Sequence, residues 1–544
     1  MAESLPSYAM PAKKPARGHR GLISVLALFV AFVLVLVLDK GSILHGMAFG
    51  TVPFTLGNIY ASIREYGYWL FSLYLLVTAG ALFLESRNPD RTLAWLLALA
   101  LLPVLGIFFY WILGPKFRSF ADKRRFRLPA PLKISKDFSI GEELPLVKDT
   151  VQLLYRTAGA RLIAGRDLVH LDDGAKAFDR IRDRLRHARR GILLESYIIK
   201  NDRLGSEIKD ILIERAQSGV LVCVLYDAVG SWHIGKDFLR ELQEGGVHVH
   251  AFLPVAFPMF RGANYRNHRK ILVVDGDVAF LGGMNIGEEY AGMSSRYTSW
   301  RDSHMELAGQ GVLVLRGIFL NDLALCGVKE DFLARAHAAT HPSDGSPEWH
   351  EGQAIPVVAE GETPMQIIAS GPDTPWDTIQ KAYFSIITRA REKLWLTTPY
   401  VVPGGALLEA LCMASLSGVD VRLLVPGKAD SPLVHWANRD CFDELLRAGV
   451  RIFLYDPTGF VHAKTILCDG AILSVGSANL DARSLRINFE VQVFLYDRRL
   501  AAEAEATFTN DLRRSFELTF DAWRKRPKIE KVKESIGKLF SSLL

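Results

Sequence analysis

An internal repeat is the feature that most constrains this chain of 544 residues. The first copy contains AKAFDRIRDRLRHARRGILLESYII, and the second contains IQKAYFSIITRAREKLWLTTPYVV. Tyr197 matches Tyr400 at an offset of 203 residues, and Gly246 matches Gly449 at the same offset. A repeat of this length predicts two structural units with the same fold.

Each copy alternates amphipathic helices with short, apolar strands. Strands that are apolar throughout are typical of a sheet that is covered by helices on both faces. We therefore predict an α/β fold of two similar lobes, over residues 140–339 and 354–524, that face each other. The segment between them, THPSDGSPEWHEGQ at 340–353, has the polar composition of a linker.

The same short motif, His-x-Lys followed by four residues and Asp, occurs in each copy. Its residues are His268, Lys270 and Asp275 in the first copy and His462, Lys464 and Asp469 in the second. Each motif continues with a pair of small residues and then Asn285 or Asn479. Because residues two apart on a strand point to one face, each His shares a face with its Lys. Two symmetric lobes would then bring both pairs into one cleft.

Two carboxylates follow the motifs at matching points of the repeat. Asp302 lies 34 residues after His268, and Glu490 lies 28 residues after His462. A catalytic histidine needs an acceptor on its second ring nitrogen to fix its tautomer, and we expect these carboxylates to supply it. The motif aspartates each precede a glycine, which is turn chemistry as much as catalysis, so a strand-holding role also stays open for them.

The two pairs contain the groups that displacement at a phosphodiester needs. A neutral imidazole can attack phosphorus, while a second, protonated imidazole supplies a proton to the leaving alkoxide. The lysines provide positive charge for the phosphoryl oxygens, with the two asparagines as neutral donors. This scheme requires no metal or other cofactor, and the sequence has no phosphate loop of the GxxxxGK type.

The doubled motif resembles that of the phospholipase D superfamily. Within it, the chain is similar to bacterial cardiolipin synthases from about residue 67 to the C-terminus, in NHRKILVVDGDVAFLGGMNIGEEY, WRDSHMELAG, VHAKTILCDG and RTLAWLLALALLPVLGIFFYWILGP. The resemblance implies two phospholipase D-like lobes that form one active site. It also implies a phosphatidyltransferase that makes cardiolipin and glycerol from two phosphatidylglycerol molecules through a phosphohistidine. His268 would be the nucleophile and His462 the acid and base; the reverse assignment stays open.

Other functions are compatible with parts of the sequence. A phospholipase D-type hydrolase differs only in that water reaches the intermediate, and a synthase could take phosphatidylethanolamine as its second substrate. A nuclease is expected to be soluble, with aromatic residues interleaved in a basic surface, and the apolar N-terminal part argues against nucleic acid as a partner. A non-catalytic lipid-binding protein predicts at least one damaged motif, whereas both motifs are intact.

The N-terminal part of the chain holds its apolar excess, which raises the mean hydropathy to +0.14. Three uncharged runs are each at least 18 residues long, enough to span a bilayer as a helix. The predicted segments are a basic tail at 1–20 and membrane runs at 21–38, 67–84 and 93–113 within 21–115.

The orientation of these segments rests on charge. Basic residues precede the first run and also occur at 116–127, and three full spans cannot place both groups on one side. We give more weight to the denser cluster at 116–127. Five scattered cysteines also fit a reducing compartment. We therefore predict a multi-pass protein of the bacterial inner membrane with a cytoplasmic catalytic domain.

The last segment, 525–544, predicts a basic amphipathic helix. Its apolar residues at helical spacing are Ile529, Val532, Ile536, Leu539 and Leu543. Such a helix can lie on an anionic lipid leaflet or pack on its own domain, and the sequence leaves both open.

Overall fold

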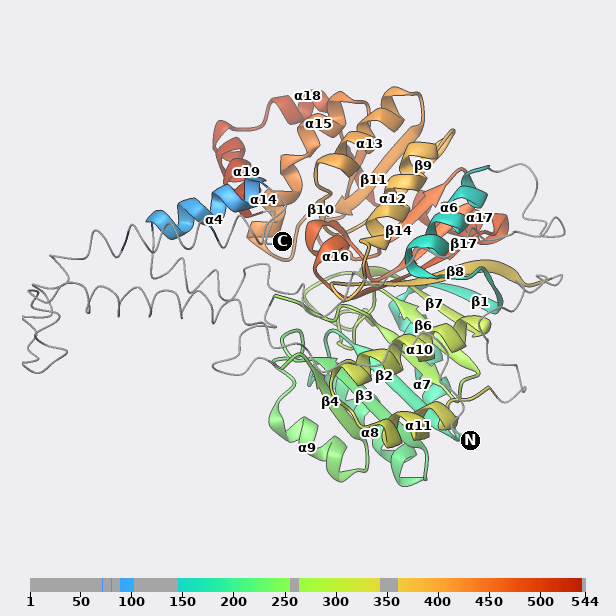
Figure 1. Ribbon diagram of the computed structural model, residues 1–544. Coiled ribbons are helices and arrows are strands. Elements are labelled where there is room, and N and C mark those ends of the chain that lie inside the picture. Colours follow the sequence, from blue (N-terminus) through green and yellow to red (C-terminus); the bar gives the residue numbers. More distant parts are fainter. Residues whose placement is uncertain are drawn as a thin grey trace, which may run out of the picture. The chain divides into compact units, whose positions relative to one another are not determined.

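The computed structural model describes residues 71, 80, 89–101, 145–254, 264–342 and 361–540 (Figure 1). The chain divides into two compact units, one of which contains α4 (Pro89–Leu101) and the other all the strands described below. Most of the three apolar runs and of the linker lies outside the described residues. Among the residues that are described, no helix is both long and apolar enough to cross a membrane.

The first repeat forms one half of the sheet and the helices that cover it. Its strands are β1 (Ile163–Asp173), β2 (Gly191–Ser196), β3 (Leu221–Asp227), β4 (His248–Phe252), β5 (Ile271–Val274), β6 (Val278–Gly282) and β7 (Trp300–Gly309). Its helices are α7 (Gly174–Arg186), α8 (Arg203–Gln217), α9 (Lys236–Glu244), α10 (Gln310–Leu325) and α11 (Glu330–Ala339).

The second repeat forms the other half. Its strands are β8 (Thr363–Ser370), β9 (Lys393–Thr397), β10 (Val401–Val402), β11 (Asp420–Pro426), β12 (Arg451–Tyr455), β13 (Phe460–Val461), β14 (Thr465–Cys468), β15 (Ile472–Gly476), β16 (Leu480–Asp481), β17 (Glu490–Leu495) and β18 (Ser515–Leu518). Its helices are α12 (Thr378–Arg389), α13 (Gly405–Leu416), α14 (Pro432–Asp440), α15 (Phe442–Arg447), α16 (Ala482–Arg486), α17 (Arg498–Leu512), α18 (Phe520–Arg524) and α19 (Lys528–Phe540).

One continuous sheet runs through both repeats (Figure 1). The strand order is β1-β7-β6-β5-β2-β3-β4 in the first and β8-β17-β15-β14-β9-β11-β12 in the second, so the two halves correspond strand for strand. They join where β1 pairs antiparallel with β8, with Gly165 opposite Thr363. The expectation of two similar α/β lobes is thereby confirmed.

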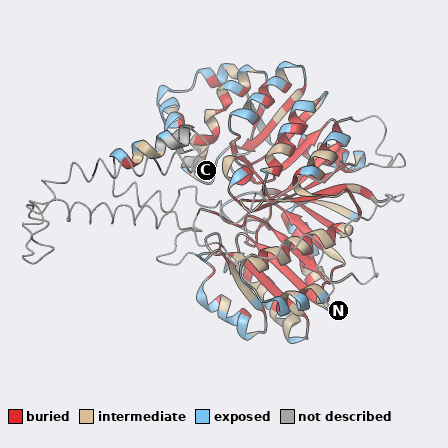
Figure 2. Cartoon of the chain, in the orientation of Figure 1, coloured by how far each residue is buried: buried red, intermediate tan, exposed pale blue. Residues whose placement is uncertain are grey.

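The strands that carry the motifs are buried along their whole length. Every residue of β2, β5, β14 and β17 is buried. Figure 2 shows the strands in the buried colour and the outer faces of the covering helices in the exposed colour. This burial is why β5 (ILVV) and β14 (TILC) show no alternation of apolar and polar residues.

Helix α7 shows how the sequence forms a covering helix. Asp173 caps its first turn by accepting a hydrogen bond from the backbone N–H of Lys176 at 3.2 Å. Phe178, Ile181 and Leu185 recur at helical spacing and are buried in the core of the first repeat. The second repeat has its own core, to which α6 (Pro145–Ala158) contributes its apolar face, although α6 lies within the predicted bounds of the first lobe.

The motif aspartates lie in the turns that join β5 to β6 and β14 to β15. Asp275 and Asp469 take left-handed φ values of 55° and 49°. The carboxylate of Asp275 accepts hydrogen bonds of 2.7–2.9 Å from the backbone N–H groups of Arg189, Arg190 and Gly191. Asp469 makes the same three contacts with the segment that leads into β9. The carboxylates thus make the strand-holding contacts that the sequence left open, and we assign them to the fold rather than to the chemistry.

Candidate active site

The two motif histidines are held where the repeats meet. His268 lies just before β5, and its backbone N–H donates to the carbonyl of Phe489 at 2.9 Å. His462 lies between β13 and β14, and its N–H donates to the carbonyl of Arg301 at 2.7 Å. Phe489 belongs to the second repeat and Arg301 to the first. Each histidine segment is therefore fixed by the backbone of the other repeat, which brings the two motifs to one junction.

Each imidazole is paired with a carboxylate of the opposite repeat. His268 Nδ1 lies 2.9 Å from Glu490 Oε2, and His462 Nδ1 lies 2.7 Å from Asp302 Oδ2. Both carboxylates are completely buried. Asp302 and Glu490 thus take the positions expected for orienting groups. The carboxylate that follows each histidine in the sequence, however, contacts the other histidine.

The carboxylates are ionised despite their burial. Desolvation raises the pKa of Glu490, but His268 and Lys270 outweigh it and hold that pKa below the ordinary value. Desolvation likewise opposes ionisation of Asp302, and His462 and its lysine hold the pKa of Asp302 low. An ionised carboxylate accepts a hydrogen bond from Nδ1–H, which leaves the lone pair of each ring on Nε2. Lys464 Nζ also lies 2.9 Å from His462 Nδ1, and with this tautomer it donates to the carbonyl of His462 instead.

The pKa values of both histidines lie well below that of a free imidazole, which favours the neutral form at pH 7. Burial lowers the pKa of His268 to about 4, against a partly compensating effect of Glu490. Burial and the neighbouring Lys464 lower the pKa of His462 to about 4. A neutral imidazole is the form that can act as a nucleophile or base.

The motif lysines lie beside their own histidines. Lys270 Nζ donates to the carbonyl of His268 at 2.5 Å, and Lys464 Nζ contacts the corresponding carbonyl of His462. Burial lowers the pKa of Lys270 to about 7 and that of Lys464 to about 8. An anion that enters the site would restore the charge of both ammonium groups, since a nearby opposite charge favours the charged form.

The motif asparagines differ in their contacts. Asn285 Oδ1 accepts from the N–H of Ile198 at 3.1 Å, and its Nδ2 donates to the hydroxyl of Tyr290 at 2.7 Å. Asn479 Oδ1 is buried and has no hydrogen-bond partner among the described residues. Asn285 therefore connects neighbouring loops through its hydrogen bonds. The side-chain oxygen of Asn479 is available to accept a hydrogen bond.

The second residue of each small pair, Gly283 or Ser477, lies against the carboxylate that holds the histidine. Ser477 Oγ donates to Glu490 Oε2 at 2.5 Å, which gives that carboxylate a donor in addition to His268. At the equivalent place, a Cβ on Gly283 would lie 2.1 Å from Asp302 Oδ1. The first repeat thus requires glycine at position 283, whereas the second repeat has Ser477 at the equivalent position, with its hydroxyl bonded to the carboxylate.

Aromatic rings that the sequence analysis did not assign to the site pack against both histidines. The ring of Tyr197 lies edge-on to His268, with centroids 4.9 Å apart. Tyr290 and Trp300 lie 5.7 and 5.5 Å from the His462 ring. The sequence offered one signal for Tyr197, its match with Tyr400 in the repeat. Nothing in the motif spacing indicates that Tyr290 or Trp300 lies beside His462.

A buried polar cluster under the first motif was also missed. Arg269 pairs with Asp322 of α10, and Asn267 donates to Glu195 of β2. All four side chains are buried. Burial, with Asp322 nearby, raises the pKa of Glu195 well above its ordinary value. The second motif has Val and Ala where the first has Asn and Arg, so the two halves of the site are supported differently.

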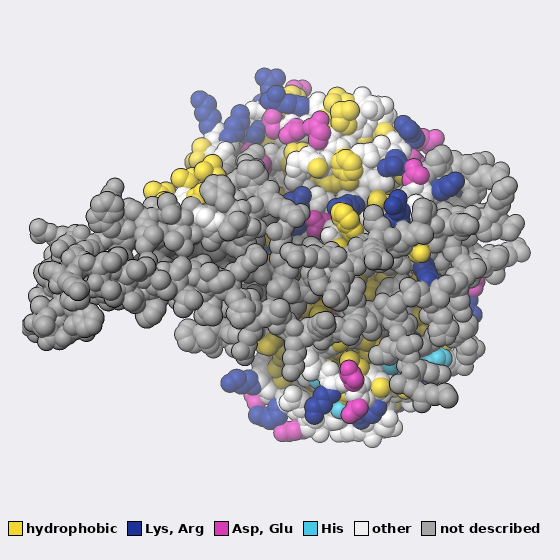
Figure 3. All heavy atoms as spheres, viewed as in Figure 1, with side chains coloured by type: hydrophobic (Ala, Val, Ile, Leu, Met, Phe, Trp, Pro, Cys, Tyr) yellow, Lys and Arg dark blue, Asp and Glu magenta, His cyan; other side chains and the backbone are white. Residues whose placement is uncertain are grey.

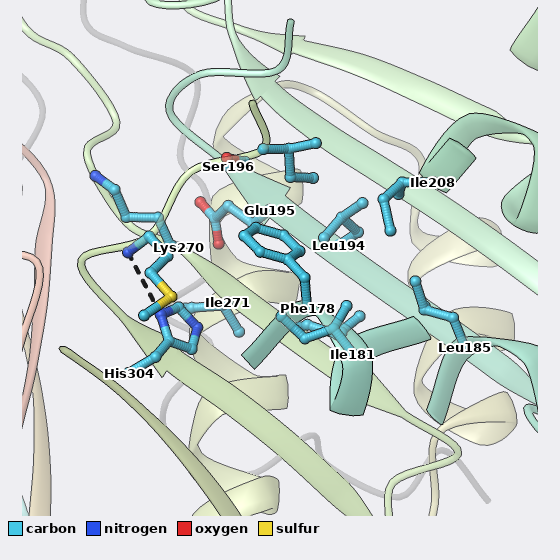
Figure 4. Close-up of a pocket in the computed structure, with 13 residues that line it drawn as sticks. Phe178, Ile181, Leu185, Leu194, Glu195, Ser196, Ile208, Lys270, Ile271 and His304 are labelled. Atoms are coloured by element: carbon cyan, nitrogen blue, oxygen red, sulfur yellow. Dashed lines mark hydrogen bonds between the residues drawn. The ribbon is translucent and has the colours of Figure 1, made fainter. Parts of the chain in front are cut away.

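Glu195 also lines a small cavity next to the site (Figure 4). The cavity has a volume of about 30 Å³, and its polar lining includes Lys270 and His304 among apolar side chains such as Phe178. His304 Nδ1 accepts from the N–H of Met284 at 3.4 Å, and burial lowers the pKa of His304 to about 4. This volume has room for a water molecule but not for a lipid group.

Two histidine–lysine pairs, one from each repeat, define a phospholipase D-type enzyme of phosphoryl transfer. A sequence profile described as "Cardiolipin synthase, PLD-like domain" matches residues 181–295 and 383–512, and one described as "Phospholipase_D-nuclease N-terminal" matches 69–115. Cardiolipin synthase 2 of Bacillus anthracis is 39% identical over 87% of this chain and 91% of its own length. The chain belongs to the cardiolipin synthase family, as its motifs predicted.

Two further comparisons concern the family and the fold. The cardiolipin synthase of Alkalihalophilus pseudofirmus is 37% identical over 96% of this chain and 99% of its own. The solved phosphatidylserine synthase of Haemophilus influenzae aligns with 73% of this chain and 99% of its own, at a TM-score of 0.56 and 16% identity. At that identity the match shows the fold alone. No group of three His, Cys, Asp or Glu side chains in the described part of the chain could hold a metal ion.

Proposed function

We propose that this protein is a phosphatidyltransferase that joins two phosphatidylglycerol molecules into cardiolipin and releases glycerol. The observation that carries the proposal is the pair of imidazoles, each held at Nδ1 by a carboxylate of the other repeat. This arrangement leaves one Nε2 for attack and one for proton transfer. The curated relatives that carry the name cardiolipin synthase support the choice of lipid substrates.

In the first step, His268 Nε2 attacks the phosphorus of one phosphatidylglycerol. The bond from phosphorus to the glycerol headgroup breaks, and protonated His462 gives its proton to the departing alkoxide. In the second step, neutral His462 takes the proton of a hydroxyl on a second phosphatidylglycerol. That oxygen attacks phosphorus, the P–N bond breaks, and His268 is regenerated. Lys270 and Lys464 carry positive charge that offsets the charge of the phosphoryl oxygens.

His462 becomes protonated when the substrate binds. Burial disfavours the charged form of its ring and lowers its pKa to about 4. An anionic phosphodiester beside the ring favours imidazolium and raises its pKa. The same anion favours the ammonium forms of the two lysines. Substrate binding therefore favours the charged forms of His462 and of both lysines, whereas the attack on phosphorus uses the neutral form of His268.

The test is the product pattern of the purified protein in vesicles that contain phosphatidylglycerol alone. We expect cardiolipin and glycerol in equal amounts, and no product from a His268→Ala variant. Phosphatidic acid in place of cardiolipin would identify a hydrolase. Cardiolipin that forms only after addition of phosphatidylethanolamine would change the second substrate.

The nucleophile is decided by trapping the intermediate. Acid quenching cleaves the P–N bond of phosphohistidine, so we propose rapid alkaline denaturation with lipid labelled at the phosphorus, followed by peptide mapping. Label on the peptide of His268 supports the assignment above. Label on the peptide of His462 would reverse the two roles.

We further propose that the apolar runs at 21–38, 67–84 and 93–113 anchor the protein in the bacterial inner membrane, with the catalytic lobes in the cytoplasm. The match of residues 69–115 to the N-terminal family profile supports an anchoring segment there. Accessibility labelling of a cysteine introduced near residue 133 in intact cells tests the orientation. Labelling by a membrane-impermeant reagent would place the lobes outside.

A further inference from the structure

The C-terminal helix α19 packs on the protein through its charged residues. Glu534 is buried and accepts a hydrogen bond from Arg439 of α14 at 3.1 Å. Glu530 accepts a second one from Arg439 at 2.6 Å. Gly537 lies so near α14 that a Cβ there would be 2.7 Å from the backbone of that helix. The polar side of α19 is therefore the side that faces the second repeat.

The apolar residues of α19 point the other way. Ile529, Val532 and Ile536 are 59%, 53% and 50% exposed. At 3.6 residues per turn they form one row on the side of the helix opposite Glu534. A helix on the surface of a soluble protein normally turns its apolar row to the core. The reversed orientation in α19 indicates that this row has a partner other than the lobe on which the helix packs.

Positive charge surrounds the row. Lys528 and Lys533 lie on its two sides, and both are exposed, as is Lys531; Lys533 Nζ also lies 5.0 Å from the ring centroid of Trp436 on α14. Figure 3 shows Lys and Arg side chains gathered on this part of the surface, over α18 and α19. The two carboxylates of the helix, Glu530 and Glu534, are engaged with α14 and do not offset these lysines on the outer face. An apolar row between exposed cations is complementary to the boundary between acyl chains and anionic headgroups.

We propose that the outer face of α19, formed by Ile529, Val532 and Ile536 with Lys528 and Lys533, lies in the headgroup region of an anionic lipid leaflet. The lipid contact is independent of the reaction proposed above, because none of these residues belongs to the active site. The occupant is a lipid surface rather than a protein groove, since the face is a convex, cationic helix side.

This surface is one helix away from the loop that joins β9 to β10. Helix α14, on which α19 rests, holds that loop through Asn438. Asn438 Oδ1 accepts from the N–H of Val401 at 2.9 Å, and its Nδ2 donates to the carbonyl of Pro399 at 3.0 Å. Tyr400, the repeat partner of Tyr197, lies between these two contacts. A lipid-bound α19 would therefore set the position of this loop relative to the bilayer.

The test uses the full-length protein in vesicles. A Val532→Cys variant carries an environment-sensitive fluorophore, in a Cys326→Ser background because Cys326 is the one cysteine of five that is not buried. The vesicles contain phosphatidylglycerol and phosphatidylcholine, with lipids that bear a nitroxide quencher near the headgroup. The matched control is Ala502→Cys, an exposed position on α17.

We expect loss of fluorescence at position 532, no loss at position 502, and little loss at 532 in vesicles of phosphatidylcholine alone. A Lys528→Gln, Lys533→Gln double variant should reduce the loss in anionic vesicles to that in neutral ones. An unquenched label at 532, whether in water or covered by another part of the chain or a second copy, would overturn the proposal. Equal quenching in neutral vesicles would overturn its electrostatic part.

Discussion

At the scale of single residues, a buried carboxylate determines what each histidine can do. Glu490 and Asp302 remain ionised without solvent because each faces an imidazole and a lysine. They fix the Nδ1–H tautomer and stabilise the imidazolium that forms during proton transfer. The motif positions were predictable from spacing alone. The crossed pairing was not, because an offset along the chain does not report which side of a junction a side chain faces.

Conversion of either carboxylate to its amide should disable one histidine with little change in shape. Asp302→Asn and Glu490→Gln each leave the side chain in place but offer the wrong partner to Nδ1, so we expect kcat to fall by about 10³–10⁴-fold. Turnover and phosphohistidine trapping are measured together. With His268 as nucleophile, Glu490→Gln reduces formation of the intermediate. Wild-type turnover in both variants, with Glu503→Gln on the exposed face of α17 as control, would contradict the orienting role.

Buried neutral histidines predict how stability depends on pH. His304 has a pKa of about 4 in the folded protein, below the value of 6.5 for an exposed histidine. Between these values the unfolded chain binds more protons, so stability is lost as pH falls from about 6.5 to about 4, by up to about 3 kcal/mol for one such ring. Thermal midpoints at pH 7 and pH 4.5 should differ less in His304→Gln than in the wild type. The exposed His187→Gln variant should leave that difference unchanged, and an unchanged difference in His304→Gln would refute the assignment.

At the scale of elements, tight turns and strand ends position the reacting groups. The hairpins β5–β6 and β14–β15 turn through left-handed aspartates whose carboxylates hold the start of β2 and β9. In the sequence, the glycines that follow these aspartates, Gly276 and Gly470, predicted the turns. The orientation of α19 had no such signal, because an amphipathic pattern gives two faces and the choice between them depends on Arg439, 95 residues before Glu534.

Loss of a turn carboxylate should affect the fold more than the chemistry. Asp275→Ala leaves three backbone N–H groups without their acceptor, and we expect a loss of about 2–4 kcal/mol in the free energy of unfolding. The protein that remains folded should keep most of its kcat. Denaturant unfolding and turnover per folded molecule measure the two effects, with the exposed Asp179→Ala as control. A catalytic role for Asp275 would appear instead as a large fall in kcat at unchanged stability.

At the scale of the whole molecule, the two repeats share one sheet and one reaction. The strand-for-strand correspondence and the junction of β1 with β8 follow from the duplication that the sequence displays. The sequence predicted that the two repeats share one active site, but it could not show that each repeat holds the histidine of the other. The backbone contacts from Phe489 to His268 and from Arg301 to His462 arise only when both are folded together.

A methyl group in the first repeat should therefore impair the histidine of the second. In Gly283→Ala the new Cβ displaces Asp302, so His462 loses its orientation, and we expect kcat to fall by about 10²-fold. Gly317→Ala on α10 is the matched control, because nothing lies within 4 Å of a Cβ there. Steady-state kinetics and circular dichroism separate the effect from misfolding. Full activity of Gly283→Ala would show that catalysis by His462 does not depend on the position of the Asp302 carboxylate.

The crossed carboxylates also bear on how such a chain could have arisen. A protein with a single repeat and the same local geometry would hold a histidine and an acid that could not meet within one subunit. It would become competent only as a symmetric pair, each member supplying the acid of the other. Fusion of two such genes would make the pairing permanent and then free the copies to diverge, as the glycine and serine beside the two acids have done.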